Sequence, residues 1–321
     1  MIVTLTPNPS IDRTVTLDEP LKRGAVQRVV SVSSVAGGKG VNISRAAVAA
    51  GVSTVAVLPA SDDDPFVHEL LSAGVDCRPV PPAGEVRVNL AITEPDGTTT
   101  KLNSPGATVT ATVLDAMAQA MITRAATARW VVLAGSLPPG APAGWYAELV
   151  TALRATRTKI AVDTSDAPLA ALVDALPVSA PDLMKPNGHE LASFTGGDGA
   201  ELESDPVAAS RAARYLVDRG VSTVLATLGG NGAVLVTADD AWFAPALPID
   251  VVSTVGAGDS SLFGYLLGEV RGLSPADRLA LGVAYGSAAA GLPGTTIPTP
   301  SQTQPDLVRV RPLNLPSEEI S

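Results

Sequence analysis

Aromatic residues, cysteine and clusters of basic residues are scarce in this sequence. Aromatic residues make up 3% of the 321 residues, whereas hydrophobic residues as a whole make up 46%. Small aliphatic side chains suit closely layered helices and parallel strands, so the composition favours an α/β fold over an aromatic-rich sandwich. A chain of this length and apolar content can bury a large core, which excludes disorder as its main state.

The sequence contains a single cysteine, Cys77, so no disulfide can form within the chain. Stable disulfides mark oxidising compartments, and we therefore expect a cytoplasmic location. The N-terminal segment lacks the basic and apolar regions of a secretory signal. Long apolar stretches are also missing, because Gly51 and Pro59 interrupt the uncharged residues 46–60. We expect no membrane association.

Positive charge is in short supply, since 22 Lys and Arg residues face 32 Asp and Glu residues and give a net charge of −10. Nucleic acid binds to a basic surface, and we expect no nucleic-acid partner. Any anionic substrate must be held by a local group of cations. Neither G-x-G-x-x-G nor G-x-x-x-x-G-K-[ST] occurs, which disfavours a Rossmann dehydrogenase and a P-loop kinase.

Short β-branched runs alternate with amphipathic stretches rich in Ala and Leu. This pattern predicts buried strands at residues 53–58, 130–134, 159–163 and 222–227, and helices at residues 41–50, 113–124, 145–154 and 207–219. Repeated strand-then-helix order requires right-handed crossovers. The sequence therefore predicts a doubly wound, mostly parallel sheet with helices on both faces.

Two segments interrupt this alternation and predict a small second sheet. Residues 14–17 with 26–32, and 85–93 with 98–102, have the composition of paired strands, and the second pair is joined at the turn-forming residues 95–97. We expect these insertions, at about 13–33 and 85–103, to form a lid over the substrate. We expect one domain over residues 1–312 and a flexible tail over 313–321.

A Gly-x-Gly turn precedes a predicted helix at residues 262–270 and follows a strand-like run at residues 249–252. Free N–H groups at a helix start can hold an anion, so Gly256, Ala257 and Gly258 are candidates for an anion hole. Asp259 beside them can take a proton from a hydroxyl group while the amides stabilise a transferring phosphoryl group. An aspartate at this position can equally serve only to cap the helix.

Polar residues and glycines also gather in two segments near the N-terminus, 6–12 (Thr-Pro-Asn-Pro-Ser-Ile-Asp) and 37–42 (Gly-Gly-Lys-Gly-Val-Asn). The carboxylate of Asp12 and the amide of Asn42 suit the hydroxyl groups of a polyol. Gly37 and Gly38 let the backbone approach a ligand closely. The ammonium group of Lys39 suits a phosphate, and a solvated surface lysine is the less favoured alternative.

With these motifs in this order, the chain resembles the ribokinase/PfkB family of carbohydrate kinases, and within it the branch of 1-phosphofructokinase and tagatose-6-phosphate kinase. The resemblance extends from Thr4 to about Pro300. It includes a Gly-Ser-Leu-Pro-Pro-Gly loop at 135–140, Lys-Pro-Asn-Gly-His-Glu at 185–190 and Thr-Leu-Gly-Gly-Asn-Gly at 227–232. It implies a ribokinase-like fold, ATP with Mg²⁺ as cofactors, and Asp259 as the base.

The predicted lid carries four polar residues that the resemblance assigns to the substrate. Side chains two apart on a strand share a face, so Arg87 with Asn89, and Lys101 with Asn103, can point at one ligand. Charged residues on strands can also serve only to protect a sheet edge. The complete set of substrate-binding residues implied by the resemblance is Asp12, Gly37, Gly38, Lys39, Asn42, Arg87, Asn89, Lys101, Asn103 and Ser136.

For the nucleotide, the resemblance implies that Glu190 helps to hold the hydration shell of Mg²⁺. Asn187 and Glu190 stand three apart at a predicted helix start, where they can also form a capping box. Thr227 can reach a phosphate, although its glycine-rich segment alone would indicate a hairpin turn. The implied cofactor-binding residues are Lys185, Asn187, Thr227, Gly229, Gly232 and Gly258.

The resemblance implies transfer of the γ-phosphoryl group of ATP to a ketohexose monophosphate, with fructose 1-phosphate preferred. Tagatose 6-phosphate and fructose 6-phosphate remain alternatives, since cations that bind a phosphate do not reveal which carbon carries it. A sugar-phosphate sensor without turnover is an alternative of a different class. The predicted lid also leaves open a homodimer that forms through it.

Overall fold

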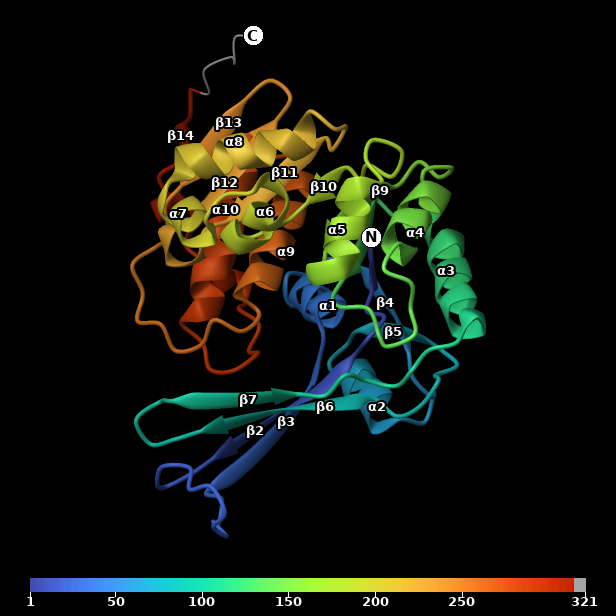
Figure 1. Cartoon of the computed structure of the whole chain (residues 1–321), viewed down its shortest axis with the longest axis vertical. Coiled ribbons are helices and arrows are strands. Elements are labelled where there is room, and N and C mark those ends of the chain that lie inside the picture. Colours follow the sequence, from blue (N-terminus) through green and yellow to red (C-terminus); the bar gives the residue numbers. More distant parts are fainter. Residues whose placement is uncertain (315–321) are drawn as a thin grey trace.

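Ten strands form the main sheet of the structure, a computed structural model that describes residues 1–314 (Figure 1). Across the sheet the strands are β14 (Arg311–Pro312), β13 (Ala241–Ala244), β12 (Ala233–Thr237), β11 (Thr223–Thr227), β10 (Leu183–Met184), β9 (Lys159–Asp163), β8 (Trp130–Ala134), β1 (Ile2–Leu5), β4 (Thr54–Pro59) and β5 (Asp76–Val80). All pairs from β11 to β5 are parallel, whereas β12, β13 and β14 extend one edge antiparallel. The predicted mostly parallel sheet is confirmed.

Helices cover both faces of this sheet, because successive side chains of its central strands point in opposite directions. On β1, Val3 and Leu5 join one buried apolar cluster and Ile2 joins the other. The first cluster also takes residues from α3 (Ala111–Ala125), α4 (Trp145–Leu153), α5 (Asp166–Asp174), α6 (Gly188–Thr195), α7 (Gly199–Ser204) and α8 (Pro206–Val217). The second takes residues from α1 (Lys39–Ala49), α9 (Ala257–Val270) and α10 (Pro275–Ala290).

A separate sheet of four strands lies below the main sheet in Figure 1. Its order is β3 (Ser31–Gly37), β2 (Ser10–Thr16), β6 (Arg87–Thr93) and β7 (Thr99–Asn103). β2 pairs in parallel with β6, and the other two pairs are antiparallel. We call these four strands the lid sheet. A third apolar cluster, which includes residues of α2 (Pro65–Ser72) and β4, packs beside it through Ile11 and Ala36.

Two predicted strands differ from the structure. The strand predicted at residues 26–32 begins only at Ser31, because Ser31 pairs with Thr16 at the end of β2 and residues 17–30 lie beyond the end of that ladder. Residues 249–252 also form no strand, since β13 ends at Ala244 and the prolines at 245 and 248 cannot donate ladder hydrogen bonds. Instead the N–H group of Val252 donates to the carbonyl of Ala290 at the end of α10.

The remaining described elements are short. Three 3-10 helices, η1 (Gly229–Asn231), η2 (Pro300–Gln302) and η3 (Pro305–Leu307), lie in connections. No helix within residues 1–314 is long and apolar enough to cross a membrane. The predicted flexible tail, 313–321, lies outside the described residues from position 315 onward.

Candidate active site

The first turn of α9 presents a buried carboxylate. Gly256 adopts a left-handed conformation, with φ of 78°, and the helix begins at the next residue. Asp259 is 7% exposed, and its Oδ2 accepts a 2.8 Å hydrogen bond from the side-chain amide of Asn42 on α1. Burial raises the pKa of Asp259, although Lys39 and Asn42 act in the opposite direction. A carboxylate with a raised pKa is a stronger base for a hydroxyl proton.

A second carboxylate, Asp163, holds two lysines in the same site. It is the last residue of β9 and is fully buried. Lys39 Nζ donates to its Oδ1 at 2.7 Å, and Lys185 Nζ forms an ion pair with its Oδ2 at 3.2 Å. Burial alone would raise the pKa of Asp163, but the two ammonium groups outweigh it and the pKa is lowered. Asp163 also raises the pKa of Lys39.

The lysines lie next to the predicted anion hole. A Cβ atom added to Gly258 would lie 3.2 Å from Lys185 Nζ, so the helix start lies directly against this ammonium group. Asp259 interacts electrostatically with Lys39, Asp163 and Lys185. The structure thus brings the anion-hole residues together with two of the three predicted lysines, Lys39 and Lys185. Sequence reasoning missed Asp163, and the only local signal was an acidic residue at the end of a buried strand.

Asn187 and Glu190 form a capping box at the start of α6. Asn187 N donates to Glu190 Oε2 at 2.9 Å, and Glu190 N donates to Asn187 Oδ1 at 2.8 Å. Burial raises the pKa of Glu190, and Lys185 opposes this. The capping interpretation is therefore correct. It leaves the second oxygen of Glu190 free to accept from a water molecule, which fits an ion such as Mg²⁺ that keeps part of its hydration shell.

The glycine-rich segment after β11 packs against the same region. Thr227 N donates to the carbonyl of Pro186 at 3.0 Å, and Thr227 forms a parallel bridge with Asn187. Gly232 has φ of 112°, and an added Cβ would lie 2.0 Å from the carbonyl oxygen of Ala244. The segment therefore needs glycine to turn between β11 and β12, and it places Thr227 beside Asn187. Gly229 also has a positive φ, of 54°.

The lid sheet contributes a row of polar side chains. Asp12, Asn89 and Asn103 are direct partners across β2, β6 and β7. Asn89 Nδ2 donates to Asp12 Oδ1 at 3.1 Å. A Cβ atom at Gly37 would lie 2.3 Å from Asp12 Oδ2, so glycine is required for this close approach. Lys101 is paired with Ala91, two residues further along these strands.

One end of the lid sheet borders an open cavity of about 510 Å³. The residues that line it are Asn8, Arg87, Asn103, Ser104, Pro105, Ser136, Leu137, Pro138, Pro139, Gly140, Ala141, Ala143, Ala167 and Pro168. Arg87 donates to the carbonyl of Ser104 at 2.8 Å, and burial lowers its pKa. The cavity therefore brings three predicted substrate residues together: Arg87, Asn103 and Ser136. Lys39 and Lys101 are not among its lining residues.

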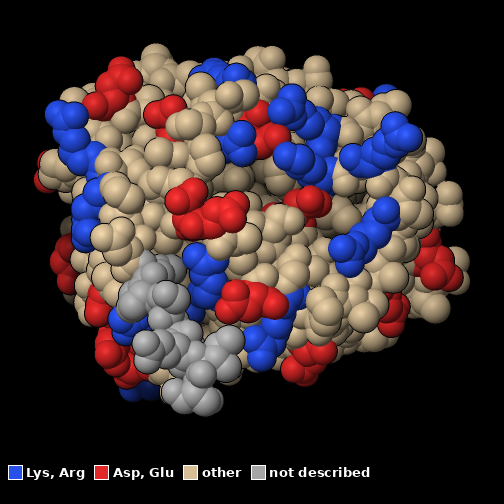
Figure 2. Space-filling view, turned by 90° about the horizontal axis from the view of Figure 1, so that it is seen from above, with Lys and Arg blue, Asp and Glu red and all other residues tan. Residues whose placement is uncertain are grey.

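Surface charge is mixed on the face away from the lid sheet. Figure 2 shows Lys and Arg side chains interspersed with Asp and Glu side chains over this face. Several Lys and Arg side chains gather toward the upper right of this view, with acidic side chains beside them. Inside the site, the cations available to an anionic ligand are Lys39, Lys185 and Arg87.

The fold and this site define a carbohydrate kinase. The chain belongs to the pfkB family of carbohydrate kinases, whose family model matches residues 6–302. It is accordingly an ATP-using phosphotransferase with an alcohol group as acceptor. The resemblance found in the sequence and the ribokinase-like fold that it implied are both confirmed.

Relatives with assigned activities match nearly the whole chain. It is 38% identical to 1-phosphofructokinase of Haloferax volcanii over 300 residues, which is 93% of each chain. It is 37% identical to 1-phosphofructokinase of Rhodobacter capsulatus over 309 residues, which is 94% of each chain. Among solved structures, phosphofructokinase-2 of Escherichia coli in complex with substrates and products matches with a TM-score of 0.85 and 28% identity, covering 94% of this chain and 96% of the other.

Proposed function

We propose that the protein transfers the γ-phosphoryl group of ATP to the 6-hydroxyl group of fructose 1-phosphate. One observation carries this proposal. Asp259, in the first turn of α9, lies near Lys39 and Lys185, and Asp163 at the end of β9 holds both lysines. This arrangement supplies a base and two cations at one point, which is what phosphoryl transfer requires. The name of the relatives, 1-phosphofructokinase, supports the choice of substrate.

In the proposed reaction, Asp259 accepts the proton of the attacking hydroxyl group. The hydroxyl oxygen forms a bond to the γ-phosphorus while the bond from that phosphorus to the departing ADP oxygen breaks. The N–H groups of Gly256 and Gly258 face the negative charge on the transferring group, whereas Ala257 N donates to the carbonyl of Thr254 at 3.4 Å. Lys39 and Lys185, both held by Asp163, neutralise the same charge. Asn42 keeps Asp259 in place through its hydrogen bond.

We propose that Glu190 is the residue that would hold Mg²⁺, through a water molecule. When bound, the ion neutralises phosphate charge and orients the phosphates. Thr227 forms a bridge with Asn187 and donates to the carbonyl of Pro186, the residue after Lys185. In the proposal, Thr227 and Asn187 contact the nucleotide together with Gly229 and Gly232.

The substrate's own phosphate binds in that cavity, where Arg87 and Ser136 meet. Asp12, Asn89 and Asn103, which share one row of the lid sheet, bind its hydroxyl groups. We expected Lys39 to bind the phosphate of the substrate. Because its ammonium group lies against Asp163 instead, we propose that it contacts the transferring phosphoryl group.

Both sheets contribute to this one site, and we propose that residues 1–312 act as a single domain with the lid strands inserted into it. Closure of the lid sheet over bound sugar would exclude water and bring Lys101 nearer to the ligand. The free, buried Cys77 is compatible with a reducing compartment, and we keep a cytoplasmic location as part of the proposal.

We also propose a homodimer that forms through the outer face of the lid sheet. Side chains alternate between the two faces of a strand, so Leu90 and Leu102 lie opposite the polar row of Asn89 and Asn103. Leu102 is 55% exposed, and so is Val32 on β3. An exposed apolar sheet face is costly in water, and a second copy of the chain would cover it.

The deciding experiment compares fructose 1-phosphate, fructose 6-phosphate and tagatose 6-phosphate at subsaturating concentration with ATP and Mg²⁺. Release of ADP under these conditions gives the ratio of kcat/KM values directly. We expect the highest value for fructose 1-phosphate. A preference for a 6-phosphate would replace the proposed substrate and keep the role of Asp259, whereas binding without turnover of any of the three would favour the sensor.

A further inference from the structure

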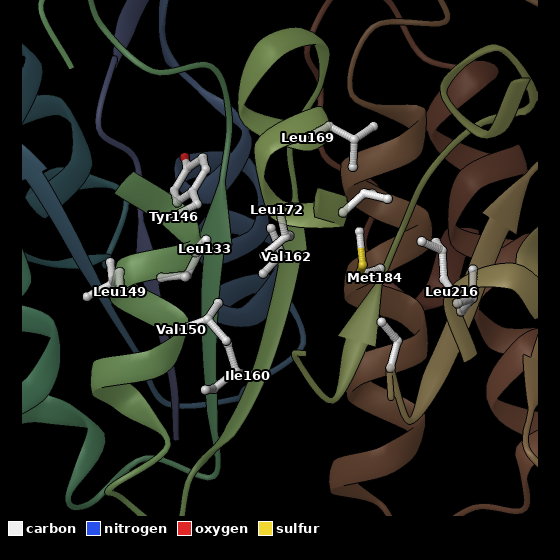
Figure 3. Packing of buried hydrophobic residues seen from close by; sticks show 14 of the residues in the cluster. Leu133, Tyr146, Leu149, Val150, Ile160, Val162, Leu169, Leu172, Met184 and Leu216 are labelled. Carbon is white, nitrogen blue, oxygen red and sulfur yellow. The ribbon is translucent and has the colours of Figure 1, made fainter. Parts of the chain in front are cut away.

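Two buried hydroxyl groups donate to one backbone carbonyl beside the cavity. Tyr146 Oη and Thr164 Oγ1 each donate to the carbonyl oxygen of Gly135 at 3.0 Å. Both side chains are buried, and Figure 3 shows Tyr146 at one end of the apolar cluster that α4 forms with the sheet. Gly135 follows directly after β8, and its N–H group donates to the carbonyl of Asp163 at 2.9 Å. Its peptide carbonyl is therefore fixed by two donors that solvent cannot reach.

This arrangement sets the direction of the next amide. In a planar trans peptide the carbonyl of Gly135 and the N–H group of Ser136 point in opposite directions. The carbonyl points at the two buried hydroxyl groups, so the N–H group of Ser136 points away from them. It has no acceptor within residues 1–314. Ser136 itself is exposed and lines the cavity together with Arg87.

A second orientation of this peptide is sterically open, because the residue before it is glycine. Gly135 has φ of 105°, a region that side-chain-bearing residues rarely adopt, and glycine places little restriction on the plane that follows. The two hydroxyl groups select one orientation. Burial raises the pKa of Tyr146 well above its usual value, so its hydroxyl group keeps its proton and remains a donor.

The geometry points to Tyr146 and Thr164 as positioning residues for phosphate binding. Through the carbonyl of Gly135 they hold the backbone N–H group of Ser136 toward the cavity, where it donates to the phosphate that Arg87 attracts. Neither side chain touches the ligand. The inference rests on the proposed function for the identity of the sugar that carries the phosphate, but the anion site itself stands on the geometry of Gly135 and Ser136.

The test uses variants that remove one hydroxyl group with little change of shape, namely Tyr146→Phe, Thr164→Val and the pair combined. Loss of one neutral hydrogen bond corresponds to a roughly 3- to 10-fold change in an equilibrium constant. We expect each single variant to raise the KM for fructose 1-phosphate by about this factor while kcat stays within about twofold. Thr164→Ser, which keeps the hydroxyl group, should behave like the unaltered protein.

Tyr285→Phe is the matched control, because Tyr285 is equally buried and its hydroxyl group has no hydrogen-bond partner within the described residues. We expect it to leave KM unchanged. If Tyr146→Phe and the double variant behave like this control, the inference is wrong. In the double variant no hydroxyl group holds the carbonyl, so its KM should exceed the product of the two single effects.

A second readout does not depend on turnover. Titration of the unaltered protein with inorganic phosphate should move the amide resonance of Ser136 at the concentrations at which phosphate binds. The same titration of the Tyr146→Phe protein should need about 3- to 10-fold more phosphate. An amide that phosphate does not move would overturn the inference even in an active enzyme. A protein that turns over no sugar phosphate would overturn the proposed function, and the titration would still decide the inference.

Discussion

Asn42 and Asp259 are 217 positions apart in the sequence, and their side chains meet in a buried 2.8 Å hydrogen bond. The bond joins the start of α1, which follows the glycine pair, to the start of α9, which carries the proposed base. Asn42 Oδ1 is buried and has no partner within residues 1–314. The amide is therefore oriented by the carboxylate on one side and offers an acceptor on the other.

The carboxylate of Asp259 should be essential for turnover but not for binding. Asp259→Asn keeps the shape of the side chain and removes the base, so kcat should fall by roughly 10²- to 10⁴-fold. Affinity for fructose 1-phosphate, measured by calorimetry, should change little. Asp277→Asn is the matched control, because Asp277 also lies in the first turn of a helix but is exposed and bonds with the capping Ser274. Equal turnover of both variants would remove Asp259 from the mechanism.

Removal of the Asn42 amide should shift the acid limb of the pH profile. The hydrogen bond from Asn42 favours the charged form of Asp259 and lowers its pKa. In Asn42→Ala that contribution is lost, so the pKa of Asp259 should rise further and the acid limb of kcat should move to higher pH. The measurement is kcat against pH with saturating sugar phosphate. A shift toward lower pH would contradict the assignment.

Asp163→Asn should lower the free energy of unfolding and also slow the reaction. The variant leaves Lys39 and Lys185 close together without their shared carboxylate, and removal of one partner from a buried ion pair typically costs about 3 to 5 kcal/mol. Urea denaturation would measure this loss in the free energy of unfolding. Adding Lys185→Met removes one unpaired charge and should recover part of the loss. If the double variant is no more stable than Asp163→Asn, the charge explanation is wrong.

Glu269 should make stability depend on pH in acid. Burial alone would raise its pKa, but hydrogen bonds from Arg129, Lys159 and Trp130 lower it to about 2. The folded-state pKa lies below the unfolded-state value, so Glu269 stabilises the fold above about pH 4.5 and loses this contribution as the pH falls toward 2. Glu269→Gln should lower the free energy of unfolding at neutral pH by about 1 to 3 kcal/mol and flatten the slope in that window.

The control for this measurement is Glu148→Gln, which changes an exposed glutamate of α4. It should leave both the free energy of unfolding at neutral pH and its acid slope unchanged. An acid slope that persists in Glu269→Gln would mean that other carboxylates produce it. Thermal or urea unfolding at several pH values between 2 and 5 would separate these outcomes.

A charge on the outer face of the lid sheet should prevent dimer formation. Leu102→Glu places a carboxylate at a position that is 55% exposed in the single chain and, in the proposed dimer, covered by the partner. Sedimentation velocity should then show a monomer. Leu71→Glu on α2 is the matched control, since Leu71 is 50% exposed and lies outside the lid sheet. A monomeric unaltered protein would exclude the dimer.

Local sequence was sufficient for much of the main sheet. The strands at Trp130–Ala134 and Lys159–Asp163 were predicted with their observed bounds, because each is a short apolar run that ends at a glycine or at a polar residue. Residues 26–30 and 249–252 have a similar apolar composition but form no strand. A strand exists only where a partner strand lies alongside, and within residues 1–314 neither segment has a partner strand.

By itself, the sequence determined the order of helices and strands, the Gly-Ala-Gly turn before Asp259 and the residue types that phosphoryl transfer needs. Only the tertiary structure decided which of these groups meet. Lys39 and Asp163 are 124 positions apart, and their ion pair holds Lys39 near the proposed base. Such pairing depends on how parallel strands and crossover helices bring distant segments to one edge of the sheet, and no local pattern of residues encodes that distance.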